Sequence, residues 1–295
     1  MYKSQKRAFL YAVPGVALVL VFVYYPLLLT FYYSFYRWNA FSPVRTFIGF
    51  ENFTRMFSDP VIRIALINNT LFAVISVIFQ CGLGLVLAAV LENKMFSKFQ
   101  TFFRTVYFMP VVVSFAVIGI LWQLALHPML GIVNPFLNLI GLGAFTQDWL
   151  GQSSTAMLSI IFVSQWQNIG YIMLLFIVAI QKIPADYYES AAIDGATGIK
   201  GFFYVTVPLV REMILVTTVI TIIGAYRVFD EVFIMTEGGP GFSSQTLATY
   251  MFRSGFRTDE MGYASAIAIL MFSVLLVLTV IQIKVSGTGK EKGEG

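Results

Sequence analysis

The stretch Ile64–Leu91 reads IALINNTLFAVISVIFQCGLGLVLAAVL and contains no Asp, Glu, Lys or Arg. A helix needs about 20 predominantly apolar residues to cross the hydrocarbon core of a bilayer, so this stretch is long enough to span a membrane. Other stretches that lack the same four residue types are Ala8–Tyr36, Thr105–Gln147, Trp149–Gln181, Met213–Tyr226 and Met261–Ile283. The sequence therefore predicts several membrane-spanning helices.

The composition of the whole chain agrees with a membrane protein. Of its 295 residues, 58% are hydrophobic and 12% are charged, whereas soluble domains carry about 25% charged residues. This composition argues against a soluble enzyme and against a disordered chain. The net charge of +4 is small, so no nucleic-acid partner is expected, and the basic residues are expected to set membrane topology. One cysteine and one histidine make a metal site built from His and Cys improbable.

We predict an all-α integral membrane protein, a bundle of about six transmembrane helices in one domain that covers residues 1–295. Breaks at His127-Pro128, Gly131 and Asn134-Pro135 limit the third span to the first half of its stretch. The fifth stretch is short and becomes a span only if it includes Arg227 and the acidic residues after it. The expected spans are approximately 8–36, 64–91, 105–126, 155–181, 211–235 and 261–283.

The distribution of basic residues predicts the orientation of these spans. With six spans and a cytoplasmic N-terminus, all nine lysines and 12 of the 19 basic residues lie inside, as the positive-inside rule requires. Both termini are then cytoplasmic. No GxxxxGK[ST] phosphate-binding loop occurs, so any phosphate-driven work must come from another chain.

The cytoplasmic loop 184–209 is the most informative segment outside the spans. It begins PADYYESAAIDGATG at Pro184 and is predicted to form two short helices joined by a glycine turn. Asp186 and Glu189 have the spacing of a capping box, and Gly195 suits the left-handed position that ends a helix. Thr197 is a candidate cap for the second helix. Such a hairpin either docks a partner protein or merely links two spans.

The run Glu189–Ala196, ESAAIDGA, followed by Phe203 and Pro208, resembles the EAA loop of ABC-importer permeases. This chain departs from the family pattern at Ser190, where Ala is usual, and at Glu212, where Pro often occurs. The resemblance implies a coupling helix that contacts an ATPase, with Glu189 facing a basic residue of that partner. The ATPase-coupling residues it implies are Glu189, Ser190, Ala191, Asp194, Gly195 and Ala196.

A second resemblance covers Phe229–Gly241, FDEVFIMTEGGPG, together with Pro14-Gly15 and Tyr25-Pro26. These motifs are similar to those of carbohydrate permeases of the maltose-transporter MalF type, with a type I ABC importer fold. The resemblance implies ATP-driven, binding-protein-dependent import of a sugar, expected to be an oligosaccharide, by alternating access. It also implies a bacterial or archaeal plasma membrane, a second MalG-like permease, two ATPase subunits and an extracellular solute-binding protein. ATP and Mg would be bound by the ATPases, and this chain would hold no cofactor and no catalytic or metal site.

A polar and aromatic patch in the fourth span is the candidate substrate pathway. Gln165, Asn168 and Tyr171 recur every three residues, and sugars are commonly held by amides and aromatic faces. Interhelix hydrogen bonding is the alternative role of the amides. Tyr226 and Asp230 are further candidates. The spacing of Arg227 from Asp230 and Glu231 would place them on one helical face, as an interfacial ion pair or as part of an outer gate.

Two other functions fit the sequence less well than an ABC permease does. An ion-coupled secondary transporter would be expected to carry carboxylates near the membrane midplane, but five of the six predicted spans contain no Asp or Glu. A membrane-embedded enzyme would need a nucleophile paired with a base, and the sequence offers one histidine, in a predicted loop.

Overall fold

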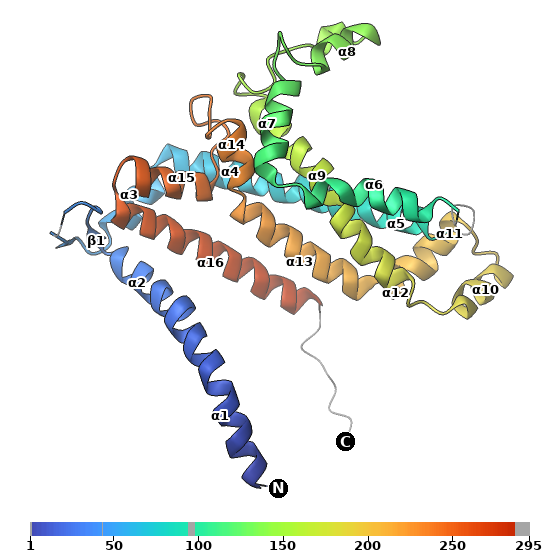
Figure 1. Ribbon diagram of the computed structural model, residues 1–295, viewed down its shortest axis with the longest axis horizontal. Helices are drawn as coiled ribbons and strands as arrows, with labels where there is room; N and C mark the ends of the chain where they lie inside the picture. The colour runs from blue at the N-terminus through green and yellow to red at the C-terminus, as the bar shows by residue number, and fades with distance from the viewer. Residues whose placement is uncertain (1, 43, 94–97, 287–295) are drawn as a thin grey trace. The chain divides into compact units, whose positions relative to one another are not determined.

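The computed structural model describes residues 2–42, 44–93 and 98–286 and is almost entirely helical (Figure 1). The described residues form one small sheet, in which β1 (Tyr36–Arg37) pairs antiparallel with β2 (Thr46–Phe47). Tyr36 lies opposite Phe47 in this ladder. The expected all-α class is therefore confirmed.

Many of the helices are continuous with their neighbours through single π-helical turns. These turns are η1 (Leu20–Tyr24), η2 (Val77–Leu83), η5 (Phe202–Thr206) and η6 (Arg253–Arg257), and a 3-10 turn, η4, covers Gly143–Phe145. The α-helices are α1 (Tyr2–Val19), α2 (Tyr25–Tyr33), α3 (Glu51–Ser58), α4 (Pro60–Ser76), α5 (Gly84–Leu91), α6 (Gln100–Val112), α7 (Phe115–Ala125), α8 (Val133–Leu139), α9 (Ala156–Ile180), α10 (Ala185–Ile193), α11 (Ile199–Gly201), α12 (Val207–Leu209), α13 (Arg211–Arg227), α14 (Asp230–Met235), α15 (Leu247–Phe252) and α16 (Met261–Ser286).

Four helical segments are long and apolar enough to cross a membrane without interruption: Tyr11–Tyr33, Pro60–Leu91, Ala156–Ile180 and Met261–Gln282. Two more candidates are bent pairs, α6 with α7 at 96° and Ile199–Leu209 with α13 at 73°. If each bent pair is one span, the described part of the chain contains six, as the sequence predicts.

The third and fifth spans differ in detail from the sequence-based expectation. Instead of one helix over 105–126, α6 ends at Val112 and α7 starts after Ser114, whose hydroxyl accepts a hydrogen bond from the Ala116 N–H at 3.4 Å. Ser114 thus caps a new helix and the chain turns sharply there. The fifth helix, α13, ends at Arg227 rather than 235, because Val228 has an extended backbone (φ −56°, ψ 121°).

The chain separates into two compact units by its internal contacts, residues 1–62 with 250–274 and residues 63–249 with 275–295. In the first unit, the carboxylate of Asp59 accepts hydrogen bonds from the hydroxyls of Tyr250 and Tyr263, both at 2.6 Å. Arg55 pairs with both carboxylate oxygens of Glu260 at 2.7 and 2.8 Å. These bonds join α3 and the residue that follows it to α15 and to the start of α16.

Burial of Asp59 raises its pKa, but the hydrogen bonds from the two tyrosines and from the Val61 N–H, together with nearby Arg55, outweigh that effect and lower the pKa below its ordinary value. Asp59 is therefore ionised at neutral pH. Burial and, after it, the hydrogen bond to Asp59 raise the pKa of Tyr250, which stays protonated as the donor.

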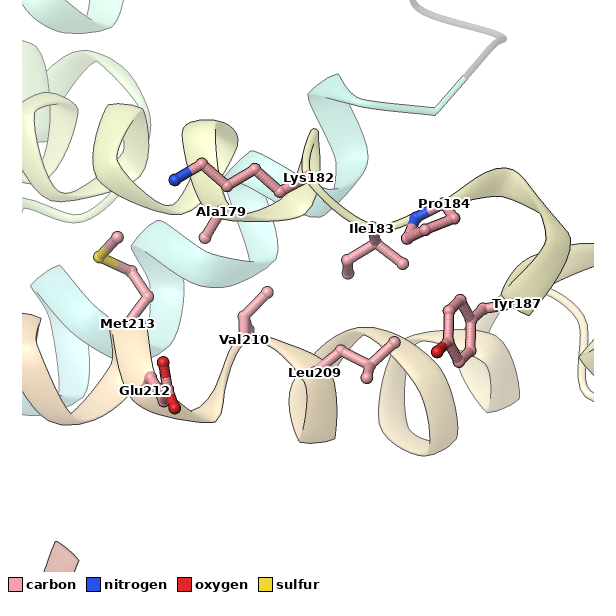
Figure 2. Close-up of a pocket in the computed structure, with 9 residues that line it drawn as sticks. All are labelled: Ala179, Lys182, Ile183, Pro184, Tyr187, Leu209, Val210, Glu212 and Met213. Atoms are coloured by element: carbon pink, nitrogen blue, oxygen red, sulfur yellow. The ribbon is translucent and has the colours of Figure 1, made fainter. Parts of the chain in front are cut away.

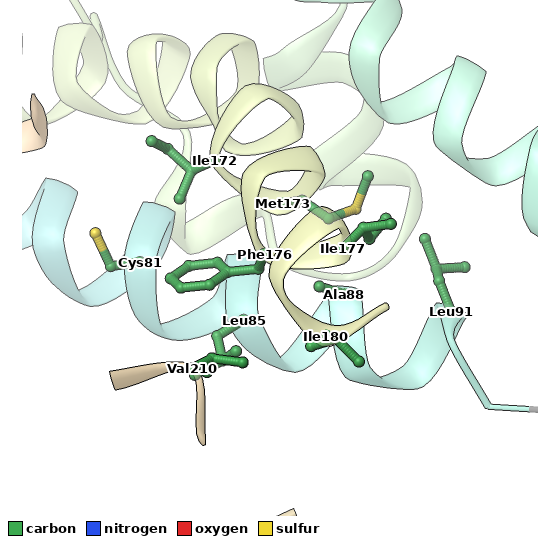
Figure 3. Close-up of a cluster of buried hydrophobic side chains, with 10 residues drawn as sticks. All are labelled: Cys81, Leu85, Ala88, Leu91, Ile172, Met173, Phe176, Ile177, Ile180 and Val210. Carbon is green, nitrogen blue, oxygen red and sulfur yellow. The ribbon is translucent and has the colours of Figure 1, made fainter. Parts of the chain in front are cut away.

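The core of the second unit lies where η2 and α5 pack on α9 (Figure 3). Phe176 of α9 is fully buried and lies among Cys81, Leu85 and Ile172 in this cluster. Cys81 is buried, and its sulfur lies 3.5 Å from the Thr221 hydroxyl. Lipid tails are as apolar as these side chains, so close van der Waals packing, and not burial from water, stabilises the cluster.

Two asparagines of α4 form hydrogen bonds with backbone groups of other segments in the second unit. Asn68 donates to the carbonyls of Ser243 and Gln245, both at 2.8 Å. Asn69 donates to the Ala225 carbonyl at 2.8 Å and accepts from the Leu247 N–H at 2.9 Å. Backbone groups within a membrane need such partners, because no water is available to satisfy them. These side chains are therefore packing groups.

Candidate functional site

The hairpin, residues 184–209, presents α10 to solvent. Tyr187 and Glu189 are exposed, and Ile193 is 88% exposed. An isolated apolar side chain on a surface is ordinary, but Ile193 lies on the same nine-residue helix as the exposed carboxylate of Glu189. This helix is available to a partner along most of its surface.

A glycine turn ends α10 in the way that the sequence predicts. Gly195 has a φ of +76°, a conformation that costs a residue with a Cβ roughly 1–2 kcal/mol. The Ala196 N–H donates to the Ala191 carbonyl at 2.8 Å, and the Gly195 N–H donates to the Ala192 carbonyl at 3.1 Å. This pair of bonds is a Schellman motif, which satisfies the last carbonyls of the helix.

The predicted caps of the two hairpin helices are wrong. Pro184 occupies the N-cap of α10, so Asp186 lies inside the first turn and no capping box forms. There its carboxylate still interacts favourably with the helix dipole. Gly198, with φ +56°, and not Thr197, precedes the second helix, α11.

The second half of the hairpin runs through α11, η5 and α12 back to the bundle. The hydroxyls of Tyr188 and Thr206 lie 3.0 Å apart and join the two halves. Ile199, Phe203 and Tyr204 are exposed and extend the apolar surface beyond α10. The last helix of the hairpin, α12, ends at Leu209, directly after Pro208.

A junction cavity of about 340 Å³ separates the hairpin from the bundle (Figure 2). Ile183, Tyr187 and Leu209 come from different elements and face the same gap. The residues that line the cavity are Ala179, Lys182, Ile183, Pro184, Tyr187, Leu209, Val210, Glu212 and Met213. Beside this cavity the hairpin packs on the bundle through Phe202 and Val207, which lie against the buried core cluster.

A second concave site, the membrane pocket, lies within the bundle of the second unit and has a volume of about 210 Å³. Its polar lining groups are amides, hydroxyls and one carboxylate, contributed by α4, η2, α9, α13 and α14. The lining residues are Phe72, Ser76, Gln80, Ser164, Asn168, Tyr171, Ile172, Ile220, Thr221, Gly224, Ala225 and Glu231.

The three candidates on α9 have different surroundings. Gln165 is buried, accepts a hydrogen bond from the Gln80 amide at 2.8 Å and donates to the Ser76 hydroxyl at 3.0 Å. Its polar groups are thus already engaged between helices. Asn168 lines the pocket, and among the described residues it donates within its own helix, to the Ser164 carbonyl at 2.9 Å and hydroxyl at 3.3 Å. Tyr171 lines the pocket with 41% of its surface exposed.

The remaining candidates lie outside the pocket lining. Tyr226 is buried, with its hydroxyl 3.0 Å from that of Thr70, and Asp230 is exposed. The expected proximity of Arg227 to two carboxylates on one helical face is wrong, because α13 ends at Arg227 and α14 starts at Asp230. No ion pair joins Arg227 to either carboxylate among the described residues.

The sequence analysis does not predict Ser164 as a lining residue, and it assigns Glu231 to an ion pair or an outer gate and not to this pocket. The hydroxyl of Ser164 lies 3.5 Å from a carboxylate oxygen of Glu231, so this contact joins α9 to α14 at the pocket. Ser164 lies four residues before Asn168 and shares its helical face, which was the available signal. Nothing local in the sequence indicated that Glu231 turns inward while Asp230 does not.

Comparison with known proteins gives a consistent result. Residues 81–286 match the family described as "Binding-protein-dependent transport system inner membrane component". The chain is 49% identical over 284 residues to the probable ABC transporter permease protein YurN of Bacillus subtilis, covering 96% of this chain and 97% of that protein. It is 30% identical over 284 residues to the trehalose/maltose transport system permease protein MalF of Thermococcus litoralis, covering 96% and 95%.

Solved structures show the same fold. A chain of a bacterial ABC transporter involved in the import of the acidic polysaccharide alginate superposes with a TM-score of 0.84 at 25% identity, covering 97% of this chain and 98% of that one. The expected fold of an ABC-importer permease is thereby confirmed.

A further relative by sequence is the arabinooligosaccharides transport system permease protein AraP of Bacillus subtilis. It is 31% identical over 294 residues, with 99% of this chain and 92% of that protein covered. The chain belongs to the family of binding-protein-dependent transport system inner membrane components, the permeases of ABC transporters.

Proposed function

We propose that this chain is one of two permease subunits of an ATP-driven importer of oligosaccharides. The exposed α10, with Glu189 on a helix that ends in a Schellman turn, is the observation that carries the proposal. Such a helix on a chain of membrane spans provides a docking surface for a motor protein. Family membership favours this mechanism over ion-coupled secondary transport.

The proposed assembly contains a second permease, two ATPases that bind ATP and Mg, and an extracellular binding protein that delivers the sugar. The chain itself then holds no ATP site and acts by alternating access. The relatives named for arabino-oligosaccharides and for trehalose and maltose support a sugar substrate.

The ATPase requirement tests this function directly. Uptake of radiolabelled sugars, including maltose and arabinotriose, should depend on ATP inside vesicles that contain both permeases, the ATPases and the binding protein. Uptake should vanish when the ATPase carries a disabled catalytic base. Transport that continues without ATP but stops with an uncoupler would instead support an ion-coupled transporter.

In the proposed orientation both chain termini and the hairpin face the cytoplasm, while Met129–Gly151 faces outward. The lysine distribution supports this orientation. In a Cys81→Ser background, an impermeant thiol reagent should label Leu139→Cys, which is 83% exposed, in cells stripped of any outer wall or membrane. Gly293→Cys should be labelled only after lysis, and the reverse pattern would contradict the orientation.

Within the membrane pocket, Asn168 and Tyr171 are proposed to contact the sugar as it passes. Asn168→Ala should remove one hydrogen bond of about 0.5–1.5 kcal/mol, a loss of roughly 2- to 13-fold in affinity. Uptake of two accepted sugars should fall unequally, while the ATPase activity of the assembled complex persists.

Gln165→Ala provides the contrasting variant, because the Gln165 amide joins helices. Its loss leaves buried partners unsatisfied, so the yield of assembled complex should fall and all sugars should be affected equally. If Asn168→Ala instead behaves in this way, Asn168 is a packing residue and does not belong to the pathway.

A further inference from the structure

The charge of the membrane pocket bears on which sugars this permease can carry. Glu231 is the one charged residue among the described residues that line the pocket. The side chain that contacts it among the described residues is Ser164, whose neutral hydroxyl lies 3.5 Å away, a distance at the limit of a hydrogen bond. The other polar lining groups are the side chains of Ser76, Gln80, Asn168, Tyr171 and Thr221.

We propose that Glu231 makes this pocket selective for neutral oligosaccharides and against acidic ones such as uronates. The proposal rests on the proposed function and narrows its substrate class. A carboxylate accepts hydrogen bonds through two oxygens, so it suits pairs of sugar hydroxyls. An acidic sugar would bring a second carboxylate into a site that offers no cation from its own lining.

The cost of placing an anion there follows from its desolvation. A charged group removed from water needs a pairing charge or several hydrogen-bond donors to replace its hydration. Glu231 is only half-buried, so its carboxylate keeps part of its hydration in the empty pocket. A bound acidic sugar would find few donors, all neutral, and Glu231 would bring a charge of the same sign. A neutral sugar ring carries no charge that must be desolvated. Hydrogen bonds from its hydroxyls to a carboxylate are roughly twice as strong as hydrogen bonds between two neutral groups.

The fold does not itself decide this selectivity. The solved transporter of similar fold imports an acidic polysaccharide, so the same arrangement of helices accommodates different substrates. Any selectivity of the permease itself must then come from the side chains at the pocket. Glu231 occupies the first turn of α14, directly after the break that ends α13, and this break turns its side chain toward α9.

The test measures binding to the assembled complex of permeases and ATPases in lipid nanodiscs, without the binding protein. The neutral probes are maltotriose, arabinotriose and lactose, and the acidic probe is trigalacturonate, each titrated by saturation-transfer NMR. Wild type should bind at least one neutral probe about 10-fold or more tightly than the acidic probe, the difference expected when one charge-assisted hydrogen bond is replaced by a repulsive contact. Glu231→Gln should reduce that affinity ratio, because the neutral probe should bind more weakly and the acidic probe more tightly.

Glu212→Gln is the matched control, because it makes the same change of carboxylate to amide outside the membrane pocket. The ratio of its affinities for the neutral and acidic probes should equal that of wild type. Glu231→Asp keeps the charge and should keep the preference if the glutamine variant fails to assemble. Equal affinity of wild type for trigalacturonate and the neutral probes overturns the inference, as does an unchanged ratio in Glu231→Gln. If trigalacturonate alone binds, the inference fails while sugar transport stands; if no probe binds, the proposed function fails with it.

Discussion

Replacing Glu189 with lysine is expected to reduce ATP-driven sugar uptake to background while the protein still inserts into the membrane. Glu189 is exposed on α10, so the change disturbs no buried group of this chain. In the proposed complex the side chain faces a basic residue of the ATPase, and juxtaposed like charges in an interface cost several kcal/mol. A penalty of about 3 kcal/mol corresponds to a loss of more than 100-fold in affinity.

Three measurements on the same membranes separate docking from folding: immunoblotting of the permease, co-purification of the ATPase, and uptake of labelled sugar. Glu189→Gln removes the charge without reversing it and should give an intermediate loss. Glu212→Lys makes the same reversal at an exposed residue outside α10 and should retain uptake. A Glu189→Lys protein that still co-purifies with its ATPase and transports normally would show that α10 does not dock in this way.

A reciprocal change can identify the partner residue. If one lysine or arginine of the ATPase pairs with Glu189, its replacement by glutamate should restore part of the uptake lost in Glu189→Lys. The double variant should then transport better than either single variant, because opposite charges again face each other. Additive losses with every basic residue tested would argue against a direct ion pair.

Four of the spans could be predicted with nearly correct limits because each is a long apolar run without charged residues. These four correspond to straight helical segments. The bend after Val112 could not be predicted in the same way, because apolar residues continue through it and only a serine cap marks the new helix. The early end of α13 could not be predicted either, since Val228 and Phe229 are as compatible with a helix as with a break.

The membrane pocket shows a different limit of sequence reasoning. Gln165 and Asn168 both carry amides on one helix, and their spacing makes both of them candidates for the substrate pathway. They differ because Gln80, 85 residues away in the sequence, meets Gln165 and no such distant side chain satisfies the Asn168 amide in the described structure. Which of two similar groups is already engaged depends on long-range contacts that local spacing does not encode.

The contact between α6 and α9 provides the second large effect. Gly170 lies on α9 where α6 crosses it, and a Cβ built at this position would lie 1.9 Å from the Tyr107 carbonyl oxygen and 2.5 Å from its carbon. Both atoms belong to the backbone of α6 and cannot rotate away. Small residues of this kind let membrane helices approach closely, and the resulting van der Waals contact stabilises the pair.

Gly170→Ala is therefore expected to force the two helices apart. Overpacking of a well-packed site costs about 1–3 kcal/mol, more than the roughly 0.5–1 kcal/mol that alanine gains over glycine within a helix. At about 2–4 °C per kcal/mol for a chain of 150–250 residues, the melting temperature of the purified permease should fall by several degrees. Gly170→Leu should prevent accumulation of folded protein.

Two other glycines of the same bundle provide a graded control. A Cβ at Gly84, also against α9, would lie 3.5 Å from the nearest atom, the Met173 nitrogen, which is an ordinary contact, and a Cβ at Gly82 would meet no atom within 4 Å. Gly84→Ala should therefore be tolerated, and Gly82→Ala should leave the melting temperature unchanged or slightly raised. The order of stability expected from thermal unfolding in one detergent is Gly82→Ala, then Gly84→Ala, then Gly170→Ala. If all three alanine variants melt together, then α6 and α9 can separate without cost, and the close backbone contact at Gly170 does not hold this bundle together.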